Sequence, residues 1–201
     1  MSPSPSAVGS APPGVRLRTM TPADLEVVSR LESELFGAEA WSPATLAAEL
    51  DRAVGPGADR RYLVAELLAA PGADAGTDCG AADPAAGGSA IVGYAGLWYG
   101  DGRGDADLLT IGTVPAARRR GVATALLEAL AQLAEDVGCR AVLLEVRASN
   151  EGARRLYAAH GFVPVGRRRR YYLAPVEDAV VMRRTLRGGA DAERGQAGAG
   201  R

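Results

Sequence analysis

The alternation of apolar and polar positions divides the first half of the chain into strands and helices. Residues 15–20 (VRLRTM) alternate as a half-buried strand does. Thr21 precedes Pro22 and Ser42 precedes Pro43, and each pair marks the start of a helix, since a hydroxyl caps the first turn and proline suits the first helical position. Three apolar stretches follow and predict strands: residues 61–67, 90–100 and 106–114.

The second half continues with a long helix between strands. Over residues 121–137 the apolar side chains recur at the i, i+3, i+4, i+7 spacing of an amphipathic helix, which Gly138 ends. The run 141–147 (AVLLEVR) is too apolar for an edge strand. The remaining pattern predicts a short helix from Asn150 to Gly161 and strands at 162–172 and 178–186. The order β-α-α-β-β-β-α-β-α-β-β indicates an α/β domain with a mixed sheet.

Three segments lack the apolar groups that offset the entropy of ordering a chain. They are residues 1–14, residues 69–89 and residues 188–201, all rich in Gly, Ala or Pro. We expect the first and last to be disordered tails and the middle one to be a flexible insertion, with an ordered edge loop as its alternative. The folded domain then spans residues 15–187.

Composition excludes several classes of function. The formal net charge of −1 excludes a whole-molecule field that attracts nucleic acid. His160 is the only histidine and the two cysteines have no CxxC spacing, so no metal site is expected. The N-terminus lacks the features of a secretory signal, and no apolar run approaches the roughly 18 residues of a membrane span. We therefore expect a cytoplasmic protein without direct contact to a membrane or to nucleic acid.

Residues 118–123 (RRRGVA) stand directly before the long helix. The first amides of a helix have no partners within it, and the helix dipole places positive charge there, so such a loop can hold an anion. Gly121 would let the backbone approach a ligand closely, and the three arginines add charge. From this pattern alone, a solvated basic loop that only caps the helix is an equal alternative.

The sequence RRRGVA resembles the pyrophosphate loop (Q/R)-x-x-G-x-(G/A) of the GCN5-related N-acetyltransferases, the GNAT family. The segment LLEVRASNEGARRLYAAHGF resembles the second half of that family's domain. The resemblance implies the GNAT acyl-CoA N-acyltransferase fold, with about six to seven strands flanked by about four helices, and acetyl-CoA as co-substrate. It also implies a set of cofactor-binding residues: Ile111, Gly112 and Thr113 through their backbone, then Arg118, Arg119, Arg120, Gly121, Val122, Ala123, Thr124 and Asn150. Val114 and Thr113 depart from the usual residue types, at positions whose contacts are made by backbone.

Several ordered motifs are similar to one GNAT group, RimI, the ribosomal-protein-alanine N-acetyltransferases. They are EVRASN, RRRYY and EDAVVM, with WSPATLAAEL nearer the N-terminus. This resemblance implies transfer of an acetyl group to the N-terminal α-amine of a protein, with a ribosomal protein as partner, by a monomer or weak dimer. The alternatives are acetylation of lysine or a small amine, and a module that binds acyl-CoA without catalysis.

Two residues are the candidates for catalysis. A carboxylate in the apolar run 141–147 should face a cleft, so Glu145 could act as general base; an ion pair with Arg147 or Arg118 is the alternative, and the resemblance favours the base. Tyr157 could be a core residue, and the resemblance makes it the general acid that protonates the leaving thiolate. Residues 167–172 (RRRRYY) either border the acceptor groove or form a solvated strand end.

Overall fold

The computed structural model describes residues 11–68 and 90–187. The expected insertion 69–89, the expected tail 188–201 and residues 1–10 of the expected N-terminal tail lie outside the described residues. Residues 11–14 lead into the first strand, where the backbone N–H of Leu68 donates to the carbonyl of Gly14. None of the described helices is long and apolar enough to cross a membrane.

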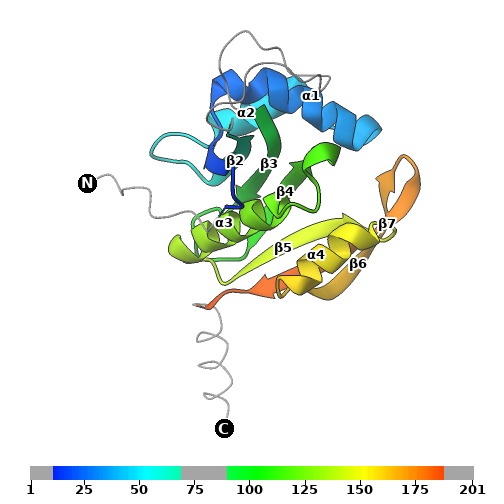
Figure 1. The fold of residues 1–201 in the computed structure, drawn as a ribbon. Helices are drawn as coiled ribbons and strands as arrows, with labels where there is room; N and C mark the ends of the chain where they lie inside the picture. The colour runs from blue at the N-terminus through cyan, green and yellow to red at the C-terminus, as the bar shows by residue number, and fades with distance from the viewer. Residues whose placement is uncertain (1–10, 69–89, 188–201) are drawn as a thin grey trace.

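The described elements follow the predicted order (Figure 1). The strands are β1 (Val15–Thr19), β2 (Arg60–Leu67), β3 (Ala90–Trp98), β4 (Ala106–Thr113), β5 (Ala141–Arg147), β6 (Val163–Leu173) and β7 (Val176–Thr185). The α-helices are α1 (Leu25–Phe36), α2 (Pro43–Asp51), α3 (Val122–Asp136) and α4 (Glu151–Ala159), and the 3₁₀ turns are η1 (Pro22–Asp24), η2 (Gly37–Glu39) and η3 (Pro115–Ala117).

The first helix begins later than the Thr21–Pro22 signal predicts. Pro22 opens the 3₁₀ turn η1, and the α-helix starts at Leu25. The cause is Asp24, whose carboxylate accepts hydrogen bonds from the backbone N–H and the hydroxyl of Thr21 and from Arg18. These bonds hold the first turn tight and delay the α-helical register.

The seven strands form one mixed sheet in the order β1-β2-β3-β4-β5-β7-β6. All neighbouring pairs are antiparallel except β4 and β5, which run parallel. That pair is short: only Ala106 and Asp107 of β4 are in register with β5. Beyond Asp107 the two strands diverge, and the backbone edge of β4 that faces β5 is left without a described strand partner.

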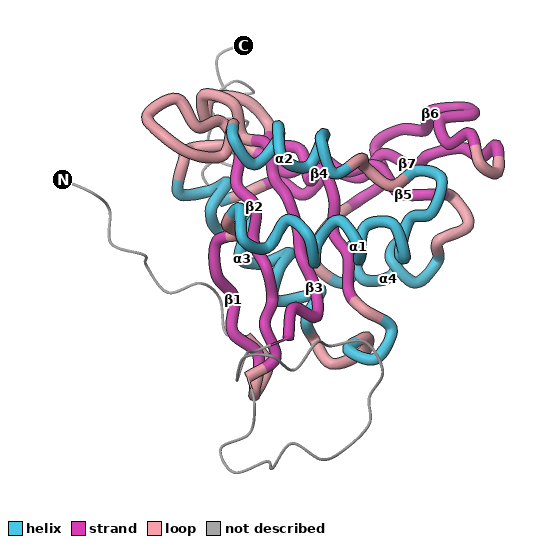
Figure 2. Tube along the Cα trace, turned by 90° about the horizontal axis from the view of Figure 1, so that it is seen from above, coloured by secondary structure: helices cyan, strands magenta, loops and turns pink. Residues whose placement is uncertain are grey.

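Helices cover both faces of the sheet, and Figures 1 and 2 show α1 with α2 on one side and α3 with α4 on the other. Val28, Leu31 and Leu46 pack on Tyr62 and Tyr94 in one buried cluster. On the opposite face, α3 contributes the larger cluster, whose centre is Val122, Leu126 and Leu130. Each such side chain contributes roughly 1.5–3 kcal/mol on burial. The two layers therefore fix the sheet on both sides of the point where β4 and β5 part.

Candidate active site

Two clefts open where β4 and β5 diverge, with volumes of about 800 and 670 Å³. The first lies between β4, α3 and α4, and the second lies between α1, β5 and the β6–β7 hairpin. They share a set of lining residues, so they meet inside the molecule: Leu35, Phe36, Ile111, Asn150, Ala153 and Tyr157. A long substrate in one cleft can therefore reach a second substrate in the other.

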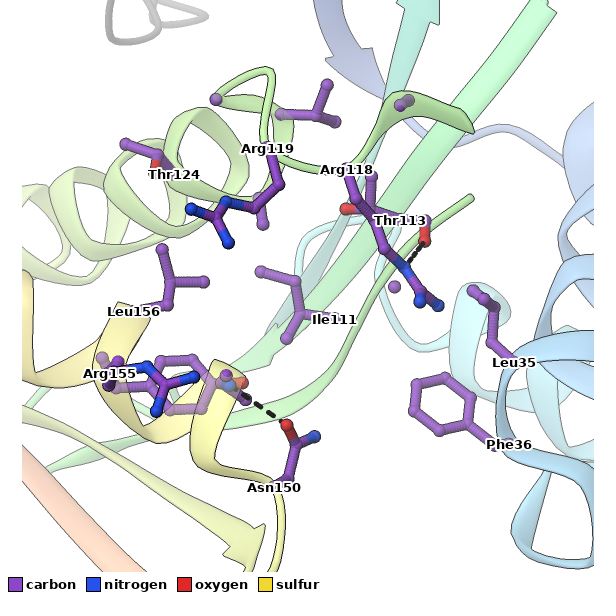
Figure 3. Close-up of a pocket in the computed structure, with 18 residues that line it drawn as sticks. Leu35, Phe36, Ile111, Thr113, Arg118, Arg119, Thr124, Asn150, Arg155 and Leu156 are labelled. Atoms are coloured by element: carbon purple, nitrogen blue, oxygen red, sulfur yellow. Dashed lines mark hydrogen bonds between the residues drawn. The ribbon is translucent and has the colours of Figure 1, made fainter. Parts of the chain in front are cut away.

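The first cleft is positive at the N-terminus of α3. Gly121 is the N-cap with φ 81°, and Arg119 also has a positive φ of 61°, so the loop turns sharply and directs amides toward the cleft. Arg118 and Arg119 extend into this region (Figure 3), and Nε of Arg118 donates to the carbonyl of Thr113 at 3.4 Å. The arrangement suits an anion such as a pyrophosphate.

The predicted cofactor residues gather in this cleft with one exception. The lining includes Ile111, Gly112, Thr113, Arg118, Arg119, Gly121, Val122, Ala123, Thr124 and Asn150. Arg120 is exposed and does not line either cleft. The left-handed conformation of Arg119 turns the chain between these neighbours, so the three arginines do not project together.

The floor of the cleft is the free edge of β4. Gly112 has no room for a side chain, because a Cβ there would lie 2.8 Å from Leu35 and 2.9 Å from Tyr94. On the α4 side of the cleft, the side chain of Asn150 caps α4 by accepting a hydrogen bond from the backbone N–H of Ala153 at 3.1 Å (Figure 3). An unpaired strand edge below a positive loop fits acetyl-CoA, whose pantetheine arm carries amides and whose diphosphate carries charge.

Sequence reasoning missed seven residues that also line the first cleft: Leu35, Phe36, Ala117, Gly152, Ala153, Arg155 and Leu156. Leu35 and Phe36 come from the end of α1, and Arg155 comes from α4 (Figure 3). The two apolar residues are far from β4 in sequence, so only the packing of α1 over Gly112 reveals them. Arg155 pairs with Glu151 one helical turn away at 3.0 Å, which is how an ordinary surface helix also looks.

The second cleft is lined by acidic and aromatic side chains. Glu32, Glu39 and Trp41 come from α1 and the segment after it, and Tyr171 and Tyr172 come from β6. Glu32 is 2 % exposed. Its carboxylate accepts hydrogen bonds from the Tyr94 hydroxyl and from the Trp41 backbone N–H, which fixes the segment after α1 against the sheet. A cationic group such as an ammonium would find complementary charge here.

Glu145 lies on β5 and lines the second cleft. One of its carboxylate oxygens is 3.0 Å from a guanidinium nitrogen of Arg168 on β6, and its side chain is 26 % exposed. The alternative partners that the sequence offered are wrong: Arg147 pairs with Glu39 and Glu177, and Arg118 donates to Thr113. The partner lies on β6, which β7 separates from β5 in the sheet, so spacing along β5 could not identify it.

Tyr157 lies on α4 and lines both clefts. Its side chain is 6 % exposed, and its ring packs against Phe162 with centroids 5.8 Å apart. Burial, together with the neighbouring Tyr172, raises the pKa of the Tyr157 phenol above its usual value. The phenol therefore stays protonated at neutral pH at the junction of the two clefts, as a proton donor must.

The RRRRYY segment divides between the two alternatives that its sequence left open: the tyrosines line the second cleft, whereas the four arginines are exposed and do not line it. Tyr171 and Tyr172 line the cleft, and their rings meet edge to face at 5.2 Å. The Arg168 guanidinium lies 5.6 Å from the Tyr171 ring centroid as well as beside Glu145. Burial, then the nearby Tyr171, raises the pKa of Tyr172 to about 12.

The histidine and the described cysteine lie outside the two clefts. His160 lies 2.8 Å from Glu128 and 3.3 Å from Thr124 through its two ring nitrogens. Cys139 is buried at 2 % exposure. Across residues 11–68 and 90–187, no group of three or more His, Cys, Asp or Glu side chains is placed to hold a metal ion.

Comparison with known proteins adds three findings. The model of the acetyltransferase (GNAT) family matches residues 44–162. The chain is 34 % identical over 174 residues to the N-alpha-acetyltransferase RimI of Mycobacterium tuberculosis, covering 85 % of this chain and 92 % of that protein. The crystal structure of the ribosomal-protein-S18-alanine N-acetyltransferase from Escherichia coli superposes with a TM-score of 0.64 at 26 % identity, covering 86 % of this chain and 94 % of the other.

A further solved structure has a similar fold. Arabidopsis thaliana NAA60 in complex with acetyl-CoA superposes with a TM-score of 0.64 at 22 % identity, covering 86 % of this chain and 98 % of the other. The mixed sheet with four α-helices is thus a fold that other acetyltransferases share.

Proposed function

Because the chain belongs to the acetyltransferase (GNAT) family and is an acetyl-CoA-dependent N-acetyltransferase, we propose that its acceptor is the α-amine at the N-terminus of a protein. The observation that carries this proposal is the junction of the two clefts at Tyr157. The positive first cleft takes acetyl-CoA. The second cleft, lined by acidic and aromatic side chains, takes the first residues of an extended acceptor chain.

Glu145 is the proton acceptor in this proposal. An amine attacks a thioester carbonyl only when it is neutral, and an α-amine with a pKa of about 7.7–8.0 needs modest help to lose its proton. The Glu145 carboxylate lines the acceptor cleft, and Arg168 orients it at 3.0 Å. It accepts the proton directly or through a water molecule.

Tyr157 is the proton donor. Attack on the thioester expels a thiolate, which needs a proton to leave as the thiol. The Tyr157 phenol lines both clefts, and because burial raises its pKa it carries its proton at neutral pH. Acetyl-CoA would supply the activated acetyl group, and the free edge of β4 at Ile111 to Thr113 would offer backbone hydrogen bonds to its pantetheine arm.

The acceptor we propose is an N-terminal alanine of a small-subunit ribosomal protein, which places the reaction in the cytoplasm. The support is the similarity to the N-alpha-acetyltransferase RimI and to the ribosomal-protein-S18-alanine N-acetyltransferase. A small first side chain also suits a cleft in which Tyr157, Tyr171 and Tyr172 occupy much of the wall.

Mass spectrometry on two peptides tests the proposal. One peptide has a free N-terminal alanine and a ribosomal-type sequence, and the other has the same sequence with a blocked N-terminus and an internal lysine. Acetylation of the first alone is the expected result. Acetylation of the second alone would move the activity to lysine and overturn the proposed acceptor, and the Glu145→Gln variant controls for uncatalysed transfer in both.

A further inference from the structure

Arg147 joins three separate parts of the chain beside the second cleft. It ends β5, two residues after Glu145, and its side chain is 23 % exposed. Its guanidinium reaches the segment after α1 and the turn of the β6–β7 hairpin, two elements that lie far apart in sequence and side by side in Figure 1. An arginine used in this way is more than a solvated charge at a strand end.

The contacts of Arg147 use the whole guanidinium fork. Nη2 is 2.6 Å from Oε2 of Glu39, and Nη1 donates to Oε2 of Glu177 at 3.1 Å. Nη2 also donates to the carbonyl of Ala174 at 3.1 Å, and Nη1 donates to the carbonyl of Pro175 at 3.4 Å, both in the hairpin turn. The guanidinium lies over the ring of Tyr172 on β6, 4.2 Å from its centroid. Planar, forked geometry of this kind is specific to arginine.

Glu39 completes the link from the other side. While Oε2 faces Arg147, Oε1 accepts the backbone N–H of Leu173 at 3.2 Å. The carboxylate of η2 therefore binds the arginine and the hairpin backbone at once. The segment after α1 is held by a second carboxylate, Glu32, through the backbone N–H of Trp41.

We propose that Arg147 and Glu39 form a positioning pair that fixes the acceptor cleft by joining the segment after α1 to the β6–β7 hairpin. Both residues line that cleft, together with Leu173 and Ala174, whose backbone they hold. Neither residue lines the first cleft. The pair therefore acts on the binding of the acceptor and leaves acetyl-CoA binding untouched.

The proposal rests on the proposed function only in taking the second cleft as the acceptor cleft. Steady-state kinetics of the full-length protein tests it, with the acceptor and acetyl-CoA varied separately. We expect Arg147→Gln and Glu39→Ala each to raise the acceptor KM about tenfold or more, with kcat and the acetyl-CoA KM within about twofold of wild type. Arg147→Lys keeps the charge and loses the fork, and should recover part of the loss.

The double variant and a distant control make the test sharper. If the two residues act as one unit, the double variant Arg147→Gln with Glu39→Ala raises the acceptor KM no more than the larger of the two single changes does. Arg103→Gln, whose side chain is 89 % exposed, controls for the loss of a positive charge. An unchanged acceptor KM, a parallel rise in the acetyl-CoA KM, or multiplicative effects in the double variant would each overturn the proposal.

Hydrogen exchange supplies a readout that needs no acceptor. The Leu173 amide donates to Glu39, so it should exchange at least about tenfold faster in Glu39→Ala and in Arg147→Gln. If the Leu173 amide exchanges at the same rate in wild type and in both variants, the proposed positioning role of Arg147 and Glu39 is wrong. If the wild-type enzyme acetylates lysine and not an α-amine, the proposed acceptor fails, yet the same KM comparison on the reactive peptide still decides the role of Arg147.

Discussion

Glu145 and Arg168 form an ion pair of 3.0 Å across two strands that are not neighbours in the sheet, since β7 lies between β5 and β6. Arg168 pairs with Ala179 of β7 in the sheet, and its side chain extends across β7 to Glu145. The ion pair fixes the position of the Glu145 carboxylate in the wall of the second cleft, as the proposed role of proton acceptor requires.

Replacing Glu145 by glutamine should lower kcat about 10²–10⁴-fold, the usual contribution of general base catalysis. Binding of acetyl-CoA should stay within about twofold, because Glu145 does not line the first cleft. Single-turnover kinetics and a cofactor titration measure the two effects. Glu151→Gln, an exposed carboxylate on α4, is the matched control and should retain wild-type rates.

Replacing Tyr157 by phenylalanine should also lower kcat, by about 10²-fold or more. The ring contact with Phe162 remains in the variant, so the fold and the junction of the clefts are kept. Tyr99→Phe controls for the loss of a partly buried tyrosine hydroxyl, since its partner is the Ala58 carbonyl, away from both clefts. Full turnover in Tyr157→Phe would remove the general acid from the mechanism.

A plot of kcat/KM against pH should rise between pH 6 and 10 and should not fall again within that range. A peptide α-amine loses its proton with a pKa of about 7.7–8.0, so kcat/KM rises through that range. A general acid must be protonated, and burial raises the pKa of Tyr157, so this group remains protonated at higher pH than a free phenol. A falling limb near pH 9 that disappears in Tyr157→Phe would contradict this assignment.

The element order was predictable because it follows from local pattern, whereas the pattern RRRGVA alone left a solvated basic loop as an equal alternative to an anion site. The stripe of Val122, Leu126 and Leu130 fixes α3, and Gly121 at its N-cap has the left-handed conformation that a glycine permits. The meeting of two clefts was not predictable from that pattern. It depends on β4 and β5 parting after Asp107, and strand register is set by tertiary packing.

The partners of charged residues were the least predictable part of the site. Arg147 and Glu145 are two positions apart on β5, yet each pairs with a different element: Arg147 with η2 and β7, Glu145 with β6. These contacts join segments more than twenty residues apart. Sequence spacing carries no information about them until the sheet order is known.

The arginines before α3 should differ in their effect on acetyl-CoA. Arg119 lines the first cleft and Arg120 does not. Arg119→Gln should therefore raise the acetyl-CoA KM about five- to tenfold, as expected for one charge-assisted phosphate contact. Arg120→Gln should change it less than about twofold. Added salt should reduce the difference in acetyl-CoA KM between the two variants, because these charges lie near the surface. Equal effects of the two substitutions would mean that charge alone matters and that the geometry of the loop does not.

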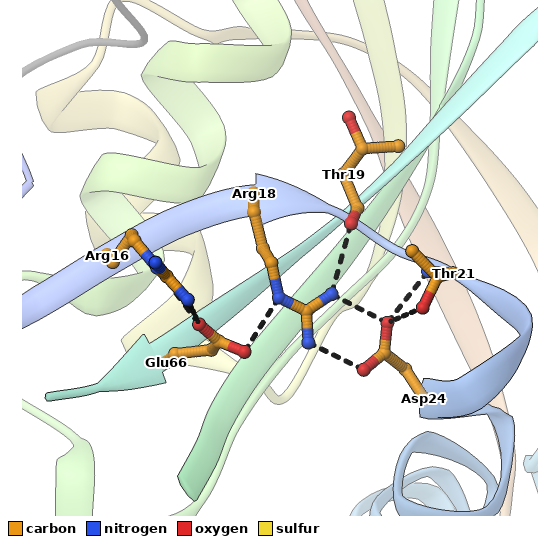
Figure 4. Close-up of polar contacts among 6 residues, drawn as sticks. All are labelled: Arg16, Arg18, Thr19, Thr21, Asp24 and Glu66. Atoms are coloured by element: carbon orange, nitrogen blue, oxygen red, sulfur yellow. Dashed lines mark hydrogen bonds and ion pairs between the residues drawn. The ribbon is translucent and has the colours of Figure 1, made fainter. Parts of the chain in front are cut away.

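A partly buried ion-pair cluster between β1, β2 and η1 should make the stability of the domain fall in acid. Arg18 bridges two carboxylates, donating to Asp24 at 2.6 and 2.7 Å and to Glu66 at 2.7 Å (Figure 4). Burial alone would raise the pKa of Asp24 and of Glu66, but the hydrogen bonds from Arg18, with those from Thr21 to Asp24 and from Arg16 to Glu66, outweigh it and lower both values.

The direction of the pH effect follows from these lowered pKa values. The unfolded chain takes up protons first as pH falls below about 4, so the stabilisation is complete above that pH and is lost below it. Asp24→Asn should reduce the free energy of unfolding by about 2 kcal/mol at pH 7, less than for a fully buried pair because Arg18 is 30 % exposed. Urea unfolding at pH 7 and near pH 3 measures both effects. The gap between wild type and variant should shrink in acid, while Asp101→Asn, an exposed control, should show little loss at either pH. A gap of constant size would mean that the loss comes from altered packing of η1, and that the charge of Asp24 contributes nothing.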